Sequence, residues 1–186
     1  THTIGLIYIK NCQKSPSAIL KNRCGSVRYY NFLNGLGKYT SLKHDPSVFT
    51  GGLDRTDFSD GVYVLHHTNC FSSIVFHVTT MMPNNPNDPN SKKRHIGNDY
   101  VNIVYSNSTH CCFPTKGSYN LNLFPGEFNF VHIAIFPLDD GYNLVRVYTK
   151  DFIPCFGPLA TNKDHIISDR SLPVLVRLTC LHADFI

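Results

Sequence analysis

The sequence predicts an α/β domain in which helices flank a mixed central β-sheet, forming a sandwich. Segments with helical signals occur near the start and at the end of the chain, and a run of strand-like segments lies between them. The 186 residues suffice for one domain with a substantial core. With 42% hydrophobic and 16% charged residues, the composition is that of an ordinary globular protein. We expect a single domain over residues 1–186, and we expect this chain to be a piece of a longer protein.

The first third of the chain carries one strand signal and two helix signals. Residues 4–10 (IGLIYIK) predict a strand. Ser15 as a helix N-cap and Pro16 in the first turn predict a helix after it. Residues 25–37 predict a second helix that ends at its last glycines. Its apolar residues at helical spacing are Val27, Tyr30, Leu33 and Leu36.

The middle of the chain alternates between loops and strands. Residues 44–61 are rich in Gly, Pro and Asp and predict a loop, and residues 62–68 and 72–82 predict a pair of strands. Residues 83–90 (PNNPNDPN) hold three prolines and four asparagines, which predicts a surface loop. Residues 101–107 (VNIVYSN) predict a largely buried strand.

The last third predicts two strands and a helix. Residues 108–124 are irregular, and two apolar strands follow at 127–138 and 141–149. The interval from Thr149 to Ser168 is predicted to be a loop because of Pro154, Gly157 and Pro158. A C-terminal helix is expected to begin at a capping Ser or Asp. Its face is marked by Leu175, Leu178 and Leu181.

Several classes of site have no signature in this sequence. GxxxxGK[ST], GxGxxG, GxSxG and HExxH are all missing, which excludes a P-loop and argues against the corresponding hydrolase and metalloprotease sites. Among ten histidines, His77 and His132 lie within apolar strands, and neighbours His66 and His67 should face opposite sides. We interpret the histidines as structural and expect no metal site. The seven cysteines include no CxxC, and we interpret them as free thiols in a reducing compartment.

A polar segment directly before the strand at 101–107 needs a different explanation. KKRHIGND, from Lys92 to Asp99, places three cations, a histidine, a glycine, an asparagine and an aspartate beside a buried strand. One interpretation is structural: Gly97-Asn98-Asp99 forms a turn and the cations form a solvated cap on it. The other is functional, because a short polar element tied to a rigid strand is well suited to present a side chain to a partner.

KKRHIGND followed by the V-x-I-V-Y strand resembles the catalytic signature of the Rap-GAP family of GTPase-activating proteins. Further segments resemble the family's tuberin-type branch in the same order, from His2 to about Ala183, so the resemblance covers nearly the whole chain. CFGPL at 155–159 is more similar to the Ral-specific branch. The other matching segments are HTIGLIYI, GSVRYYNFLNGLG, FTGGLD, IVFHVTTMMP, GEFNFVHIAIFPLD and IISDRSLPVLVR.

The resemblance implies the fold of the Rap-GAP catalytic domain and a mechanism. Such a domain is not an enzyme by itself but a GTPase activator, which supplies an asparagine thumb to the active site of a small GTPase. The matching residue here is Asn98. GTP and Mg²⁺ are bound by the partner GTPase, so no cofactor is expected on this chain.

The resemblance also suggests roles for the neighbours of Asn98. His95 would hold the thumb or contact the partner, and Lys93 and Arg94 would meet acidic residues or phosphate on the GTPase. Lys92 would only tune the encounter rate. Four further residues complete the predicted site: Gly97 to allow close backbone approach, Asp99 as a brace or a simple turn residue, Asn129 near the catalytic surface, and Phe130 as core or contact.

The partner expected from the resemblance is a GTP-bound small GTPase, Rheb-like before Ral-like and Rap-like. A difference in the loop at 83–90 from the tuberin type could change that choice. A scaffold subunit bound through other parts of the protein is a further expected partner. The location expected is cytoplasmic, with recruitment to membranes through partners. Two alternatives remain open: a module that binds a GTPase without catalysis, and a nucleic-acid binder that uses the three cations.

Overall fold

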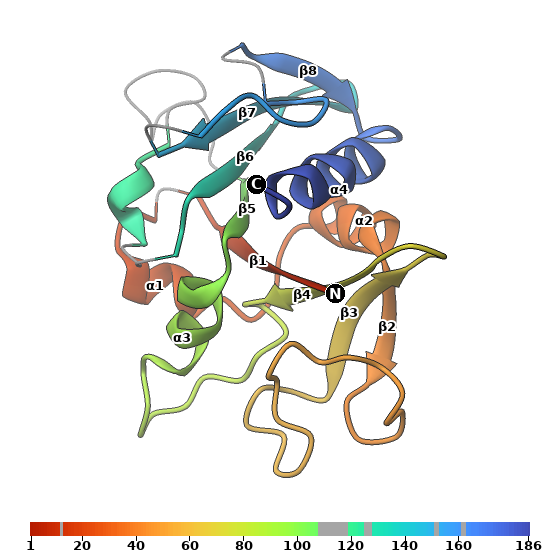
Figure 1. The fold of residues 1–186 in the computed structure, drawn as a ribbon. Helices are drawn as coiled ribbons and strands as arrows, with labels where there is room; N and C mark the ends of the chain where they lie inside the picture. The colour runs from red at the N-terminus through yellow and green to blue at the C-terminus, as the bar shows by residue number, and fades with distance from the viewer. Residues whose placement is uncertain (12, 108–118, 125–127, 151–152, 161–162) are drawn as a thin grey trace.

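The fold is built on one β-sheet, seen in a computed structural model that describes residues 1–11, 13–107, 119–124, 128–150, 153–160 and 163–186 (Figure 1). The described strands are β1 (His2–Ile9), β2 (Lys38–Ser41), β3 (Tyr63–Thr68), β4 (Ser73–Val78), β5 (Val101–Ser106), β6 (Val131–Pro137), β7 (Tyr142–Thr149) and β8 (His165–Ser168). The helices are α1 (Pro16–Leu20), α2 (Val27–Leu36), α3 (Ser91–Asn98), α4 (Leu172–Ala183) and the 3₁₀ helix η1 (Leu121–Leu123).

The sheet is mixed, as the sequence predicted. Its order is β2-β3-β4-β1-β5-β6-β7-β8. The four central strands β4, β1, β5 and β6 run parallel, and each side continues into two antiparallel strands. Strand β5 is buried along its whole length, because helices cover both faces of a parallel sheet centre.

One face of the sheet is covered by α2 and α4 (Figure 1). The odd-numbered residues of β5 and their neighbours on β1 form this core face, and the two helices pack on it and on each other. Helix α2 begins at Ser26, whose hydroxyl accepts a hydrogen bond from the backbone N–H of Tyr29. The buried side chains that the helices contribute include Tyr29, Phe32, Leu33, Leu36, Leu172, Val176 and Cys180.

The opposite face is covered by α1, α3 and η1. Ser15 caps α1 as predicted, accepting from the backbone N–H of Ala18, with Pro16 in the first turn. Ile19 and Leu20 of α1 and Ile96 of α3 are buried in this second core. The sheet contributes mainly even-numbered residues of β5 and β6 and odd-numbered residues of β1, namely Ile7, Ile9, Val104, Ala134 and Phe136.

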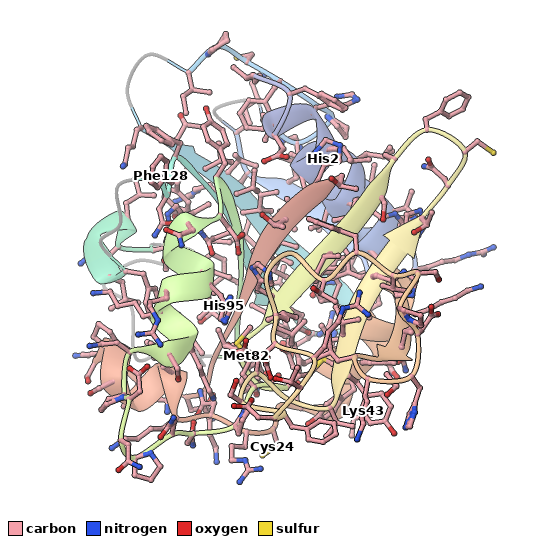
Figure 2. The ribbon with its side chains drawn as sticks, turned by 60° about the horizontal axis from the view of Figure 1, so that its bottom comes forward. His2, Cys24, Lys43, Met82, His95 and Phe128 are labelled. Carbon is pink, nitrogen blue, oxygen red and sulfur yellow. The ribbon has the colours of Figure 1, made fainter. Side chains whose placement is uncertain are left out.

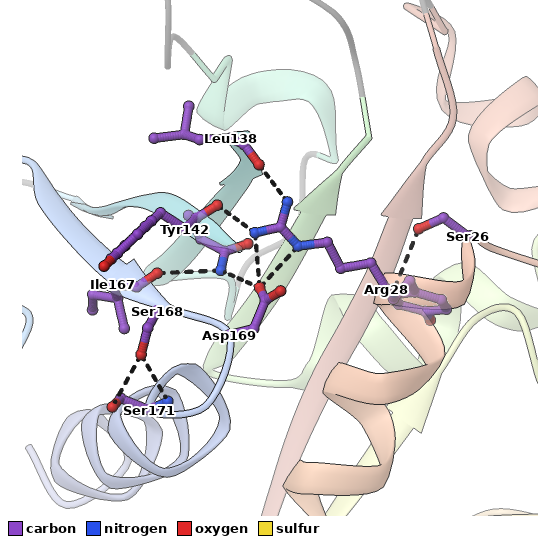
Figure 3. Close-up of polar contacts among 10 residues, drawn as sticks. Ser26, Arg28, Leu138, Tyr142, Ile167, Ser168, Asp169 and Ser171 are labelled. Carbon is purple, nitrogen blue, oxygen red and sulfur yellow. Dashed lines mark hydrogen bonds and ion pairs between the residues drawn. The ribbon is translucent and has the colours of Figure 1, made fainter. Parts of the chain in front are cut away.

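A polar clamp closes the end of the molecule remote from α3. The guanidinium of Arg28, near the start of α2, donates to the backbone carbonyls of Leu138 and Tyr142 and to Oδ1 of Asp169 (Figure 3). Asn143 Nδ2 donates to the same Asp169 oxygen at 2.7 Å. Asp169 lies just before α4, where the sequence predicted a simple helix cap. It instead connects α2, the β6–β7 turn and the end of β8.

Three predictions about the elements were wrong. The strand at 38–41 was not predicted, because KYTS is short and lies at an exposed sheet edge with no apolar alternation. Residues 165–168 form β8 within the interval predicted to be a loop, because pairing with β7 stabilises them. The helix faces were shifted: Val27 is 79% exposed and Leu178 42%, since both helices carry more apolar residues than one face accommodates. The irregular stretch at 108–118 lies outside the described residues.

Candidate functional site

The polar segment at 92–99 forms helix α3 followed directly by β5. The interpretation of Gly97-Asn98-Asp99 as a turn is wrong, because the helix continues through Asn98 and only Asp99 leaves it, with extended φ and ψ of −80° and 129°. Ile96 is fully buried under the helix, and burying such a side chain contributes roughly 2 kcal/mol. Helix α3 therefore has one apolar anchor and a polar outer surface.

Asn98 is the last residue of α3, and its side chain is exposed. Within the described part of the chain, its carboxamide has no hydrogen-bond partner. Asparagine carries one acceptor oxygen and two N–H donors, all of which are available for an external ligand here. The position predicted to be catalytic is therefore accessible.

The next residue, Asp99, lies inside the molecule. Its side chain is 1% exposed, and its Oδ2 accepts a hydrogen bond from Nδ1 of His77 on β4 at 2.8 Å. The prediction of His77 as a buried structural histidine is confirmed, and its specific partner is the residue after Asn98. Between the two alternatives for Asp99, the geometry is that of a brace below the helix end rather than a solvated turn.

A second buried group holds the same helix end. Asn102 Nδ2 lies 3.2 Å from the carbonyl of Ile96, 3.4 Å from that of Asp99 and 3.2 Å from Oδ1 of Asn129. Asn129 Nδ2 in turn donates to the carbonyl of Phe124 at 2.9 Å. Asn129 was predicted to be near the catalytic surface, and it lies beneath that surface as a buried support.

Glycine is required at position 5 of β1 by this network. Gly5 is paired in register with His77 on one side and Asn102 on the other. A Cβ at this position would lie 1.9 Å from Asn102 Oδ1 and 3.2 Å from Asp99 Oδ2. Because glycine has no side chain, Asn102 and Asp99 have room to lie beneath the end of α3.

His95 connects α3 to the long loop between β2 and β3. Its Nε2 lies 2.9 Å from Oδ1 of Asp60, and its ring centroid is 5.2 Å from that of His77. In Figure 2, His95 lies on the side of α3 turned toward β1 and β4. The i, i+3 spacing places His95 and Asn98 on one side of the helix. Within the described residues the two side chains make no hydrogen bond to each other, and His95 instead ties the helix to Asp60.

The three cations of the motif have three different environments. Lys92 is 4% exposed and donates through Nζ to the carbonyl of Leu20 at 2.8 Å, so the prediction that it tunes partner encounter is wrong. Burial, with a contribution from Arg23, lowers the pKa of Lys92 to about 8. Arg94 is exposed and paired with Asp88 of the predicted surface loop. Lys93 is half-buried.

The two remaining predicted site residues differ in accessibility. Gly97 faces open space, since nothing lies within 4 Å of a Cβ built there. Phe130 is partly buried: its ring stacks on Tyr100 at 5.0 Å, and Lys150 Nζ lies 4.4 Å from its centroid. Phe130 is thus mainly a packing residue at the edge of the site.

The described residues hold no group of three or more His, Cys, Asp or Glu side chains arranged for a metal ion. His132 is buried beside the hydroxyl of Tyr119, and burial together with Lys150 lowers its pKa to about 4. Four described cysteines are free: Cys24, Cys70, Cys155 and Cys180. In the part of the chain that the structure describes, no helix has the length and apolar character needed to cross a bilayer.

Comparison with known proteins identifies the family. Residues 19–186 match the Rap/ran-GAP family, which is nine-tenths of the chain. This chain belongs to the Rap/ran-GAP family. The solved structure of the TSC2 GAP domain is similar to it, with 39% identity and a TM-score of 0.83 over 99% of this chain and 95% of that one. The α/β fold predicted from the resemblance is therefore confirmed.

Curated relatives agree with this assignment. The tuberous sclerosis 2 protein homolog of Schizosaccharomyces pombe is 37% identical over 191 residues, which is 96% of this chain. The human Ral GTPase-activating protein subunit alpha-1 is 34% identical over 184 residues, or 98% of this chain. The Rap/ran-GAP chain spans only 14% and 8% of their respective lengths.

The sequence pointed to the exposed asparagine of this candidate site and to few of the buried groups beneath it. Asp60 gave no signal beyond that of a loop aspartate, and Asn102 looked like one polar residue in a strand. One pattern could have pointed to the buried support. The four residues His77, Gly5, Asn102 and His132 are neighbours in register on the parallel strands β4, β1, β5 and β6. That row is visible only when the strand order is known.

Proposed function

We propose that this domain accelerates GTP hydrolysis on a small GTPase by inserting the carboxamide of Asn98 into the partner's active site. The observation that carries the proposal is an exposed, unpaired Asn98 next to a deeply buried Asp99. Exposure makes the carboxamide available, and the buried neighbour fixes the backbone that presents it. Precise presentation from a rigid element is what a group needs to act in another protein's active site.

The chemistry asked of Asn98 is orientation and not proton transfer. Small GTPases hydrolyse GTP slowly when the attacking water is poorly positioned and the charge of the transition state is poorly compensated. A carboxamide can accept a hydrogen bond from the water and donate one toward the γ-phosphate. Both effects lower the barrier through placement and through dipoles oriented in advance. GTP and Mg²⁺ are contributed by the partner.

The support of α3 determines how well Asn98 can act. Asp99 is held by His77, and the carbonyls of Ile96 and Asp99 are both held by Asn102. These contacts fix the last turn of α3 from below, and Ile96 anchors it in the core. A helix end fixed in this way loses little conformational entropy when the complex forms.

The cations near Asn98 contribute to recognition of the partner. Lys93 is half-buried, and we expect its exposed part to approach acidic residues or phosphate on the GTPase. Arg94 is shared with Asp88 of the 83–90 loop, so this loop competes with the partner for the guanidinium. The loop thereby contributes to partner selection.

The partner class we propose is a Rheb-like GTPase, followed by Ral-like and Rap-like GTPases. The order follows from the similarity to a tuberous sclerosis 2 protein homolog and then to a Ral GTPase-activating protein subunit. We place the activity in the cytoplasm, with recruitment to membranes and to a scaffold subunit through other parts of the protein.

The test is single-turnover GTP hydrolysis by a panel of Rheb-, Ral- and Rap-like GTPases. Wild-type domain should accelerate one of them, and Asn98→Ala should lower the stimulated rate by on the order of 10². The matched control is Asn34→Ala, which removes another exposed helical asparagine, on α2. Urea unfolding should give the same stability for all three proteins, within about 0.5 kcal/mol.

The outcomes separate catalysis from binding. Equal stimulation by wild type and Asn98→Ala would remove Asn98 from the mechanism. Tight binding of one GTP-loaded GTPase with no change in its hydrolysis rate would identify the domain as a binding module. A nucleic-acid binder is disfavoured, because Lys92 is buried and Arg94 is paired.

A further inference from the structure

The contact between His95 and Asp60 joins α3, which carries Asn98, to a loop that has had no function so far. The carboxylate Oδ1 of Asp60 lies 2.9 Å from His95 Nε2, and the side chains are 13% and 18% exposed respectively. An ionised carboxylate can only accept, so the imidazole N–H donates. The contact connects α3 to the loop between β2 and β3, which spans residues 42–62.

Asp60 is itself held in place. Its second oxygen, Oδ2, accepts a hydrogen bond from the backbone N–H of Asp54 at 2.9 Å. Phe58, two residues earlier, has a φ of 61°, which is rare for a bulky residue. Gly61, one residue later, has a φ of 110° and lies where a Cβ would be 2.7 Å from the carbonyl of Met81. Phe58 therefore has a backbone conformation that non-glycine residues rarely adopt, and Gly61 has one that a side chain would strain. Such conformations cluster at functional sites.

The rest of the loop is a folded support and not a free segment. The guanidinium of Arg55 donates to the backbone carbonyls of Leu42, Asp45 and Val48. The carboxylate of Asp54 accepts from the backbone N–H groups of two following residues. These bonds satisfy the loop's polar backbone internally and give Asp60 a defined position relative to the sheet.

Among the described residues, the hydrogen bond to Asp60 holds the imidazole of His95 from one side. Its other neighbour is the ring of His77, at 5.2 Å between centroids, which itself is bonded to Asp99. A carboxylate that accepts from one imidazole nitrogen sets the tautomer and the orientation of the ring. Asp60 therefore controls which nitrogen and which edge of His95 face outward, one helical turn before Asn98.

We propose that Asp60 is a positioning residue that acts through His95, and that the 42–62 loop serves to hold this histidine in register with Asn98. The proposal rests on the proposed function for its effect on GTP hydrolysis. Asp60 is largely buried behind His95, so it should affect how well the complex reacts more than how well it forms. In kinetic terms, the maximal stimulated rate of GTP hydrolysis should depend on Asp60. The domain concentration at which stimulation is half-maximal should not.

The experiment combines a double-mutant cycle with a spectroscopic readout. Single-turnover hydrolysis is followed against domain concentration for wild type, Asp60→Ala, His95→Ala and the double variant. Asp60→Ala should lower the maximal rate about tenfold and change the half-saturating concentration less than about threefold. The double variant should be no slower than His95→Ala alone, because Asp60 acts through that ring. The control is Asp139→Ala, which removes an exposed aspartate in the β6–β7 turn, outside this loop.

The second readout needs no GTPase. The ring nitrogens of His95 are observed by ¹H–¹⁵N NMR, and the Nε2 resonance should move in Asp60→Ala but not in Asp139→Ala. If the Nε2 resonance does not move in Asp60→Ala, the proposal is overturned. It is also overturned if the two substitutions lower the maximal rate additively, or if Asp60→Ala changes only the half-saturating domain concentration. If wild-type domain stimulates no GTPase, the proposed function fails. The NMR result then decides alone whether Asp60 positions His95.

Discussion

The carboxylate of Asp99 and the imidazole of His77 form a buried hydrogen bond at 2.8 Å, between the residue that follows α3 and the sheet strand β4. The two side chains meet over Gly5 of β1, the strand between β4 and β5. The position of α3 is therefore set by the sheet itself and not by the loop that precedes the helix. Changes in this pair should affect both the stability of the domain and the presentation of Asn98.

Replacing Asp99 tests whether its hydrogen bond to His77 stabilises the domain. Asp99→Ala leaves His77 buried without its partner, and we expect the free energy of unfolding to fall by about 2 to 3 kcal/mol. Urea unfolding measures the change. Asp139→Ala, which removes an exposed aspartate in the β6–β7 turn, should cost less than about 0.5 kcal/mol. An Asp99→Ala domain as stable as wild type would show that the bond contributes nothing.

Gly97 offers a substitution that should separate stability from activity. A Cβ fits at this position without contacts, so Gly97→Ala should stabilise the helix by up to about 1 kcal/mol. The added methyl lies next to Asn98 and should hinder the partner, lowering GTPase stimulation. Gly35→Ala in α2 is the contrast, because its Cβ would lie 2.5 Å from Pro173 and should destabilise. Unchanged stimulation by Gly97→Ala would show that the partner does not approach this backbone closely.

The lysine pair at the start of α3 should differ in its effect on association. Lys93→Met removes an accessible cation, and we expect association with the GTPase at low salt to slow roughly threefold. Lys92→Met should leave the association rate unchanged, since its ammonium is buried against Leu20. Stopped-flow association at two salt concentrations measures both. If both variants slowed association with the GTPase equally, the difference in burial between Lys92 and Lys93 would not determine their effect on association.

The lowered pKa of His132 predicts how the free energy of unfolding depends on pH. Its pKa is near 4 in the folded protein because of burial and Lys150, against 6.5 for an exposed histidine. Between these values the unfolded chain binds a proton that the folded chain does not, so stability rises with pH. The contribution is fully present above pH 6.5 and is lost as pH falls toward 4, by about 3 kcal/mol in total.

The measurement is urea unfolding at several pH values from 4 to 7 for wild type and His132→Gln. The slope of stability against pH should be smaller in the variant, because a neutral side chain binds no proton in the unfolded state. His44→Gln, which changes an exposed histidine, should keep the wild-type slope. Identical slopes for wild type and His132→Gln would show that His132 does not titrate differently on folding.

Elements marked by strong local signals could be predicted from the sequence. The capped start of α1 at Ser15, the buried strand at 101–107 and the loop at 83–90 each follow from residues next to one another. Asn98 could be selected because its whole motif resembles a known signature. In each case the information lies within a short window.

Features that depend on contacts between distant segments could not be predicted. Lys92 resembles its neighbours in the sequence, but only its orientation toward α1 makes it buried. β8 is a strand because β7 lies beside it, although its own residues give a weak signal. Asp60 acquires a role only when the 42–62 loop reaches α3. The buried residues that support the site come from distant segments of the chain, whereas its exposed asparagine belongs to one short motif.

The parallel centre of the sheet has a consequence for the order of folding. Strand β1 is paired with β4 on one side and β5 on the other, so Ile4 meets both Phe76 and Val101. The antiparallel pairs β3–β4 and β6–β7 close short loops and can form early. β1 has to remain without its neighbours until much later segments are available, and folding of its core should be slow. The support of α3, which includes Gly5, is therefore completed among the last steps.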